Sequence, residues 1–585
     1  MGTNAVIAAL IALAAPAAAP SGPPTMPVAD IQRGMKCVGR TVFEGAKIEE
    51  FACEILGVLP GAWGPGDDVI IARLLGKTAE RYGVIAGMSG SPIFIDGKLI
   101  GALSLSMGTF QKEAIAGITP IDAMQRVRAS NGWPGARNGG GASPMDARPR
   151  SAGDYEFRPI TTPLVISGVS PEAMPIVRSL LEPHGFMVTT GAGGALGATP
   201  VPGAADTIQP GGALAGLLVT GDVNIAGTGT VTWRDADTVL AFGHSFLLYG
   251  NVEMPMATSD IITVVASQNL SYKLGAPKQI VGSIVRDNRT AIAGRFGVEA
   301  RMIPVKVTLP EGTQPREIRF NVFRNRVLSA PMMTVGVMNG LVSNAAYDAE
   351  GTLRIDGRVK VAGHPDVVLS RTYFDPGAGG GSIPSMAVEI STMLQRLFEN
   401  DLSEAAVGEI ELKLGVDKTR RETRIDAAWS ERASVKAGET VGVRVRMRPW
   451  RGAAELREVL VKIPEGTPAG SLTVSVSDAK VMDAKDRVSP GSPARPDDLA
   501  ALIASFNARR DEDSLYVRLS RNTPGAIVRG VNLPALPPTA LGVVRGAEKS
   551  AGGAEPLTDT VVDEVRMPLG ARVAGSAEFT LRVDP

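Results

Sequence analysis

The sequence predicts a mainly β protein made of several domains. Gly (68 residues) and Pro (42) are abundant among its 585 residues, and aromatic residues make up only 5%. Val, Ile and Thr recur in short alternating runs, a pattern that favours strands and turns over long helices. The chain is also too long for one hydrophobic core, so we expect about two to four domains.

Residues 1–24 have the pattern of a secretory signal peptide. An apolar run extends from Ala5 to Ala15, and small residues follow at positions 17–19, although no Lys or Arg precedes the run. The run is short for a bilayer span, and no later segment has 18 uninterrupted apolar residues. We therefore expect an exported protein, periplasmic or extracellular, without a stable membrane span.

Residues 28–130 read as a β lobe of short strands whose end, in AIAGITPIDAMQRVRAS, becomes helical. The only two cysteines, Cys37 and Cys53, are equally distant from Gly45 in two strand-like runs. A hairpin centred at Gly45 would place them opposite each other, a geometry compatible with a disulfide in an oxidising compartment. Two small buried thiols are the alternative interpretation.

The rest of the chain divides by composition. Residues 131–206 are rich in Gly and Pro and predict a linker with one short helix in SPEAMPIVRSLLEPHG. Residues 207–402 predict a second β lobe, closed by a helix near 387–401. Residues 403–585 alternate strands with Gly and Pro turns, which is typical of a β-sandwich-like accessory domain.

Charge and motif content exclude several function classes. Lys plus Arg and Asp plus Glu both number 60, so no net charge attracts nucleic acid, and we expect no nucleic-acid partner. The sequence contains no CxxC, no HExxH, no calcium-loop spacing and no P-loop. It therefore predicts neither a metal site nor a cofactor.

The segment GMSGSPIFIDGKLIGAL carries the first candidate for catalysis, Ser89. Glycines on both sides allow a tight turn that exposes the hydroxyl and directs the amides of Gly87 and Ser89 at one point, as in an oxyanion hole. A strand, an Asp96-Gly97 turn and a returning strand come next, the same order as after the nucleophile of chymotrypsin-like proteases. The alternative is a glycine-serine turn with no chemical role.

A nucleophilic serine needs a base, and the chain has only three histidines. His184 ends a predicted helix and His364 lies in a turn-like segment. His244, in DTVLAFGHSFLLYG, directly follows an apolar strand and a glycine, so its ring would project from a strand end. We predict His244 as the general base, with a buried structural histidine as the alternative.

Three motifs together, GMSGSPIFIDGKLIGA, GTGTVTWRDADTVLAFGH and GSIVRDNRTAIAGRFG, resemble the sporulation factor IV B family of serine peptidases. The resemblance covers residues 30–125 and 205–310. It implies a chymotrypsin-like double β-barrel assembled from two separated segments. It also implies a serine endopeptidase that acts on protein or peptide substrates, with Ser89 as nucleophile and His244 as base.

The sequence departs from that family in two respects. In the family the histidine motif precedes the serine motif, whereas here Ser89 comes 155 residues before His244. No carboxylate lies near Leu74, where the family carries its aspartate. Asp287 is then the first candidate for the triad acid and Asp260 the second, and a surface aspartate is the alternative for each. A catalytically inactive, protease-like binding or envelope scaffold is the competing function.

Overall fold

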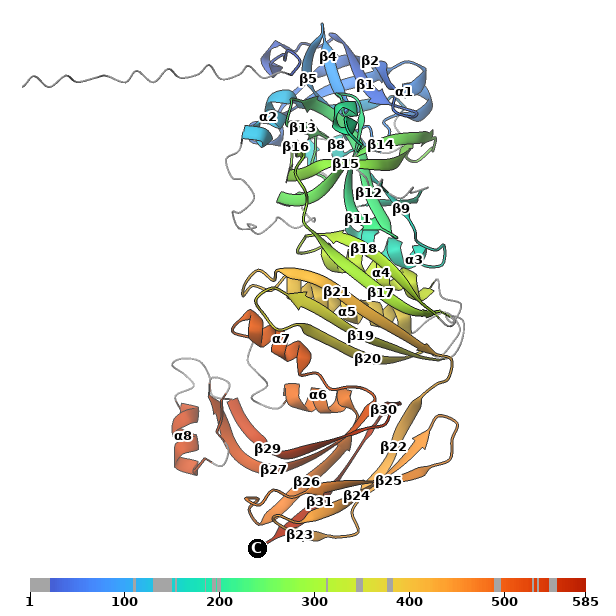
Figure 1. Ribbon diagram of the computed structural model, residues 1–585. Helices are drawn as coiled ribbons and strands as arrows, with labels where there is room; N and C mark the ends of the chain where they lie inside the picture. Colours follow the sequence, from blue (N-terminus) through green and yellow to red (C-terminus); the bar gives the residue numbers. More distant parts are fainter. Residues whose placement is uncertain are drawn as a thin grey trace, which may run out of the picture. The chain divides into compact units, whose positions relative to one another are not determined.

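The computed structural model divides the chain into two compact units. Unit 1 comprises Met1–Val165, Gly191–Leu217 and Ala226–Ala300, and unit 2 contains the rest (Figure 1). Most of the predicted signal peptide, residue 130 and residues 131–149 of the predicted linker lie outside the residues that the structure describes. The described residues are 22–108, 112–129, 150–152, 155–184, 186–191, 196, 201–311, 314–342, 351–375, 382–488, 496–528, 531–533, 536–546 and 555–585.

Six described strands of unit 1 close into a first barrel, which carries the serine motif. Their order is β4-β1-β2-β3-β6-β5, and β5 pairs with β4 to close the ring. Helix α1 (Lys77–Tyr82) precedes the serine turn, and α2 (Ile121–Ala129) follows the last strand, as predicted from the sequence. The strands are β1 (Lys36–Val42), β2 (Ile48–Gly64), β3 (Asp67–Leu75), β4 (Pro92–Ile95), β5 (Lys98–Ser106) and β6 (Ile115–Pro120).

The first hairpin of this barrel has the predicted register. Cys37 lies directly opposite Cys53 in the β1–β2 ladder, with their Cα atoms 4.8 Å apart. The two sulfurs form a disulfide, and both side chains belong to the core of the barrel. The structure thus has the bridged form of this pair rather than two buried thiols.

Six further strands close into a second barrel, which carries the histidine motif. Their order is β12-β13-β16-β15-β14-β11, and β11 also pairs with β12. The prediction of a mainly β, chymotrypsin-like double barrel built from two separated segments is thereby confirmed. The strands are β11 (Ala213–Gly221), β12 (Asn224–Arg234), β13 (Thr238–Ala241), β14 (Gly250–Val265), β15 (Tyr272–Asn288) and β16 (Ala291–Phe296).

Between the two barrels, short strands lie outside both rings. Strand β8 (Tyr155–Pro159) pairs with β5 of the first barrel and with β7 (Arg150–Ala152). Strand β9 (Pro163–Ser167) pairs with β12 of the second. The chain then forms α3 (Met174–Leu181), within the predicted helical segment, and β10 (Met187–Thr190). Residues 155–165 therefore accompany both barrels of unit 1.

The longest segment of unit 2, Arg301–Pro585, begins with a sheet packed against two helices. Residues 301–402, which the sequence pattern groups with the histidine motif, fall in this unit. Helices α4 (Ser329–Val342) and α5 (Ser382–Phe398) pack together and on the sheet, and α5 overlaps the predicted helix near 387–401 (Figure 1). The strands, in sheet order, are β18 (Gln314–Phe323), β17 (Met302–Glu311), β21 (Val407–Asp417), β19 (Gly351–Val361) and β20 (Val367–Asp375).

The C-terminal part of unit 2 is a two-sheet sandwich, as the alternating sequence predicts. One sheet has the order β25-β24-β22-β30 and the other β23-β31-β26-β27-β28, with β29 on β27. Their inner residues form one core cluster, mostly valine, leucine and isoleucine. The elements are β22 (Glu422–Trp429), β23 (Ser434–Lys436), β24 (Thr440–Pro449), β25 (Glu455–Lys462), β26 (Gly470–Ser477), α6 (Ala479–Val488), α7 (Leu499–Asn507), β27 (Ser514–Val528), β28 (Val531–Leu533), α8 (Pro538–Gly546), β29 (Glu555–Pro568), β30 (Arg572–Ala574) and β31 (Ser576–Asp584).

Candidate active site

The turn around Ser89 depends on its two flanking glycines. Gly87 has φ +90° and Gly90 has φ +95°, a region that side chains with a Cβ rarely occupy. A Cβ at Gly90 would also lie 1.9 Å from the carbonyl oxygen of Thr230. Only glycine fits there, because the serine turn approaches the backbone of β12 so closely.

Hydrogen bonds from β12 anchor the carbonyls of this turn. The amide of Thr230 donates to the Ser89 carbonyl at 2.8 Å, and its hydroxyl donates to the Gly87 carbonyl at 3.1 Å. The hydroxyl of Thr232 donates to the Gly90 carbonyl at 2.7 Å. The second barrel thus holds the backbone of the turn that the first barrel supplies.

The two amides predicted for the oxyanion hole have no acceptor. Within the described part of the chain, neither the Gly87 nor the Ser89 amide donates a hydrogen bond, whereas the amides on either side of Ser89 do. Met88 donates to Ile85 at 3.0 Å, and Gly90 donates to Leu103 at 2.7 Å. Amides that are fixed in a turn and unpaired are suited to bind a developing oxyanion.

The segment before His244 packs against the serine turn and against β6, on which Thr119 lies. A Cβ at Gly90 would lie 2.5 Å from the amide nitrogen of Phe242, and that amide donates to the Thr230 carbonyl. Gly243, with φ +70°, accepts a hydrogen bond from the Thr119 hydroxyl at 2.6 Å. The structure therefore brings the serine and histidine motifs together despite their separation in sequence.

Ser89 and His244 are both buried, and their reactive atoms lack partners. The exposed fraction is 0% for Ser89 and 3% for His244. Neither Ser89 Oγ nor His244 Nε2 has a hydrogen-bond partner among the described residues, so they do not bond to each other. An unsatisfied buried polar group costs roughly 1–3 kcal/mol, and catalytic hydrogen bonds are often long before substrate binds.

His244 is held as the tautomer that a general base requires. Its Nδ1 lies 2.6 Å from the Ser245 carbonyl, to which the neutral ring donates through Nδ1–H. Nε2 is then the nitrogen with a free lone pair. Burial lowers the pKa of His244 to about 4, an effect that the nearby carbonyls of Ser245 and Ile160 partly oppose. The ring is thus neutral at pH 7.

Asp287 is buried and binds the segment that follows His244, not its ring. Its carboxylate accepts from the amides of Phe246 at 2.7 Å and Leu247 at 2.5 Å. Burial raises the pKa of Asp287 to about 6, against the effect of these backbone amides. Among the described residues, no hydrogen bond joins this carboxylate to His244. Asp287 is only 1% exposed, so the alternative of a surface aspartate was wrong for this residue.

Asp260 has a different environment. It lies on β14, is partly exposed and forms an ion pair with Lys278 on the adjacent strand β15. Among the described residues, no hydrogen bond or ion pair joins Asp260 to His244. Of the two candidate acids, Asp287 is the one that contacts the histidine segment.

Lys273 is a polar residue near the serine turn that the sequence pattern does not reveal. It is 1% exposed, and its Nζ donates to the hydroxyls of Thr41 at 2.6 Å and Thr230 at 3.4 Å. Burial lowers the pKa of Lys273 to about 7. Thr230 also bonds the Gly87 carbonyl, so Lys273 is connected to the turn. The sequence segment LSYKLGAP gives no signal of this role, which depends on tertiary contacts.

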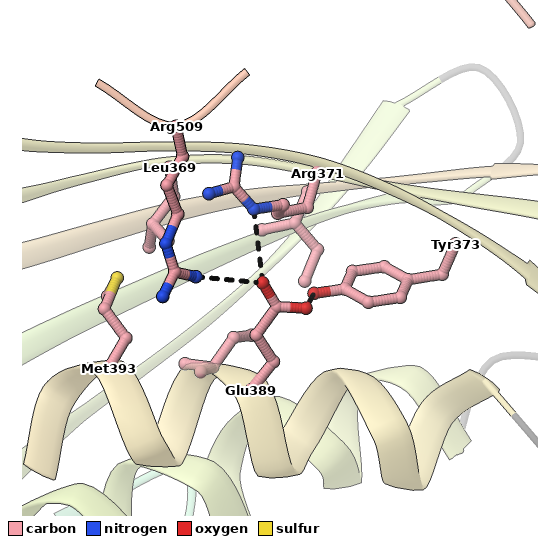
Figure 2. Close-up of a pocket in the computed structure, with 8 residues that line it drawn as sticks. Leu369, Arg371, Tyr373, Glu389, Met393 and Arg509 are labelled. Atoms are coloured by element: carbon pink, nitrogen blue, oxygen red, sulfur yellow. Dashed lines mark hydrogen bonds and ion pairs between the residues drawn. The ribbon is translucent and has the colours of Figure 1, made fainter. Parts of the chain in front are cut away.

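A small cavity in unit 2 is a second candidate site. It has a volume of about 10 Å³ and is lined by residues of β19, β20 and α5 and by Arg509. Figure 2 shows the Glu389 carboxylate bonded to Arg371, Arg509 and Tyr373, the last at 2.7 Å. The space holds about one water molecule. Its polar groups are paired with one another, so the arrangement is that of a structural cluster.

Two other kinds of site are absent from the described residues. No group of three or more His, Cys, Asp and Glu side chains lies there in an arrangement able to bind a metal ion. No helix in that part of the chain combines the length and the apolar character needed to cross a membrane.

Comparison with known proteins identifies the segment that carries the serine motif. The family model described as SpoIVB peptidase S55 matches residues 22–113, which include β1 to β5 and Ser89 but not His244. No curated protein and no solved structure matches the chain. Residues 22–113 are therefore similar to the SpoIVB peptidase S55 family, which confirms the predicted resemblance for the segment with the serine motif.

Proposed function

We propose that the protein is an exported serine endopeptidase of the SpoIVB type, with Ser89 as nucleophile and His244 as general base. One observation carries the proposal. The buried Ser89 hydroxyl and His244 Nε2 belong to segments that pack together, and within the described part of the chain neither these atoms nor the Gly87 and Ser89 amides have a hydrogen-bond partner. The family match supports a peptidase acting on proteins or peptides. The signal-like N-terminus and the Cys37–Cys53 disulfide support export.

The proposed reaction follows the acyl-enzyme route. Ser89 Oγ attacks the carbonyl carbon of the substrate peptide bond while His244 Nε2 takes its proton. The amides of Gly87 and Ser89 bind the oxyanion of the tetrahedral intermediate. The intermediate collapses to an ester of Ser89, and His244 returns the proton to the leaving amine. Water, deprotonated by the same ring, then hydrolyses the ester and restores Ser89.

In this mechanism Asp287 is proposed as a positioning residue. It binds the amides of Phe246 and Leu247 and so fixes the backbone directly after His244. The Ser245 carbonyl takes the place at Nδ1 that a carboxylate has in a Ser-His-Asp triad. A carbonyl orients the ring but stabilises its protonated form less than a carboxylate does. The proposed enzyme is therefore expected to be slower than one with a complete triad.

The test is labelling of the purified mature protein with a fluorophosphonate probe, which reacts with activated serines. We expect labelling of the wild-type protein and its loss in both Ser89→Ala and His244→Ala. Ser91→Ala is the matched control, because the Ser91 hydroxyl already donates to the Met88 carbonyl at 2.7 Å. Labelling that survives in Ser89→Ala would place the reactive group elsewhere and contradict the proposal.

A non-catalytic binding or envelope scaffold is the second candidate function. Its support is the missing carboxylate at Nδ1 of His244 and the complete burial of Ser89. It predicts no labelling of folded protein under any condition that opens the site. A folded variant that stays unlabelled although its site has been opened by substitution would favour this candidate.

A further inference from the structure

One edge of β5 carries three partners in succession. Strand β4 pairs with its first half, where Pro92 faces Ala102. The serine turn comes next, since Gly90 donates to the Leu103 carbonyl at 2.7 Å and Leu103 donates to Ser91 at 2.9 Å. Strand β8 occupies the remainder of this edge. The serine turn and β8 are therefore neighbours along β5.

Strand β8 runs toward the serine turn. It pairs with β5 in antiparallel fashion, with Arg158 opposite Ser106 and Pro159 opposite Leu105. The amide of Ile160 then donates to the Ser104 carbonyl at 2.8 Å. Each residue advances a strand by roughly 3.3 Å, so Ile160 lies about one step from the position where the serine turn meets Leu103.

The main chain of Ile160 also lies beside His244. Its carbonyl is close enough to the ring to raise the pKa of His244 against the effect of burial, although Nε2 has no hydrogen-bond partner. A peptide that runs along β5 toward the turn thus ends with a carbonyl next to the base. The acyl side of a substrate needs this direction, but its carbonyl would accept from the Gly87 and Ser89 amides, to which the Ile160 carbonyl does not bond.

The side chains of Ile160 and Thr162 pack against the first and the second barrel, respectively. Ile160 is 2% exposed and belongs to the apolar cluster that contains Met88 and Leu103 of the serine barrel. Two residues later, Thr162 is also buried, and a Cβ at Gly227 of β12 would lie 3.2 Å from its methyl group. Residues 160–162 therefore cross from the first barrel to the second beside the serine and histidine motifs.

Strand β8 is an addition to a barrel that is already closed. The six strands of the serine barrel form a ring without it. Adding an extended segment to a free sheet edge is a common way for proteins to bind peptides, with side-chain pockets that provide specificity. An internal segment does this at a high effective concentration, so it competes strongly with a free peptide.

We propose that residues 158–162 occupy the substrate-binding edge of the peptidase as an internal substrate mimic. The site would accordingly accept extended peptides with a branched aliphatic residue directly before the cleaved bond. This inference rests on the proposed function. Ile160 takes the place of the residue directly before the cleaved bond, with its carbonyl outside the oxyanion hole, and an incoming peptide must displace the segment. The full burial of Ser89 follows from the same occupancy.

The first experiment compares Ile160→Ala with Ile463→Ala, which removes the same atoms from a fully buried isoleucine near the β-sandwich in unit 2. We expect fluorophosphonate to label Ser89 at least about tenfold faster in Ile160→Ala than in the wild-type protein. Ile463→Ala should keep the wild-type rate. Equal rates in all three proteins would overturn the internal-mimic proposal while leaving the peptidase itself established.

Hydrogen–deuterium exchange of the wild-type protein provides a test that needs no catalysis. The Ile160 amide is bonded to Ser104, so peptides covering residues 155–162 should exchange slowly and become faster in Ile160→Ala. Free exchange of this segment in the wild-type protein would overturn the proposal. Slow exchange with no labelling of any folded variant would instead contradict the proposed function and with it the substrate role of this edge.

The third arm tests specificity. Peptides that differ only in the residue before the cleaved bond, Ile, Val, Lys or Asp, are given to Ile160→Ala. We expect kcat/KM to be at least about tenfold higher for Ile and Val, because a buried apolar pocket disfavours a charge. Preference for Lys or Asp would contradict the assignment. A cut between Ile160 and Thr161 in the protein itself, absent in Ser89→Ala, would support it.

Discussion

A polar cluster in unit 2 and the candidate active site in unit 1 are built in opposite ways. In unit 2, the Glu389 carboxylate is shared between two arginines and a tyrosine hydroxyl around a cavity for about one water. In unit 1, Ser89 and His244 are more deeply buried, yet among the described residues neither Ser89 Oγ nor His244 Nε2 has a hydrogen-bond partner. Unsatisfied buried polar groups are rare in native proteins, and the proposed chemistry of Ser89 and His244 would explain why this site has them.

One alanine substitution in each cluster should have the largest effects on labelling and on stability. Ser89→Ala should abolish labelling, a loss of at least about 10³-fold, and leave stability almost unchanged, since the hydroxyl makes no hydrogen bond. Glu389→Ala should leave labelling unchanged and lower the free energy of unfolding by roughly 1–3 kcal/mol, because Tyr373 and two arginines lose their acceptor.

Labelling rates and urea unfolding of both variants provide the measurement. The comparison between the clusters fails if Glu389→Ala removes labelling at unchanged stability, or if Ser89→Ala destabilises the protein as much as Glu389→Ala does.

Gly90→Ala should lower the free energy of unfolding by several kcal/mol and remove most of the labelling of Ser89. The new Cβ would meet the Thr230 carbonyl at 1.9 Å, and φ is +95°, so the serine turn must move away from β12. Gly97→Ala is the matched control, because φ is +76° there but nothing lies within 4 Å of the new Cβ. The control should cost only about 1–2 kcal/mol, the penalty of the left-handed backbone alone. Similar losses of stability and labelling in the two variants, measured by urea unfolding and probe reaction, would show that contact with β12 is unimportant.

The pH dependence of stability should distinguish the environments of His244 and Asp287 in the candidate active site. His244 has a pKa of about 4 against an ordinary 6.5, so the unfolded chain binds more protons in that window and stability rises with pH. Asp287 has a pKa of about 6 against 3.8, so the folded chain binds more protons there and stability falls with pH. The two slopes, each equivalent to roughly 3 kcal/mol over its window, oppose each other in the wild-type protein.

Removing either group should therefore expose the slope of the other. Asp287→Asn should make stability rise between pH 4 and about 6, and His244→Gln should make it fall over the same range. Pulse proteolysis in urea, read from peptides of unit 1, measures both. The same slope in both variants would contradict the assigned environments.

The local parts of the site could be predicted from sequence, and the long-range parts could not. The six residues GMSGSP are enough to predict a tight turn at Ser89, and with only three histidines in the chain few candidates compete with His244 for the role of base. The register of Cys37 and Cys53 followed from hairpin geometry alone. Each of these predictions depends on neighbouring residues or on elimination.

Thr230, Lys273 and Ile160 were missed because their roles depend on contacts across the fold. Thr230 reaches Gly87 over more than 140 residues, and Lys273 reaches Thr41 over more than 230. The end of unit 1 at Ala300 could not be predicted from the sequence either, because a strand-like pattern resumes directly afterwards in β17. Alternation of apolar residues identifies a strand but not the sheet that the strand joins.

The anchoring of the serine turn by β12 has a consequence for the timing of biosynthesis. A chain emerging from its N-terminus presents Ser89 long before Thr230, Thr232 and His244 exist as folded neighbours. Until the second barrel follows, the turn lacks both its anchor and its base. If the proposed function holds, the growing polypeptide is thus expected to be inert toward other proteins during synthesis, and to acquire a reactive serine only once residues beyond 244 have folded.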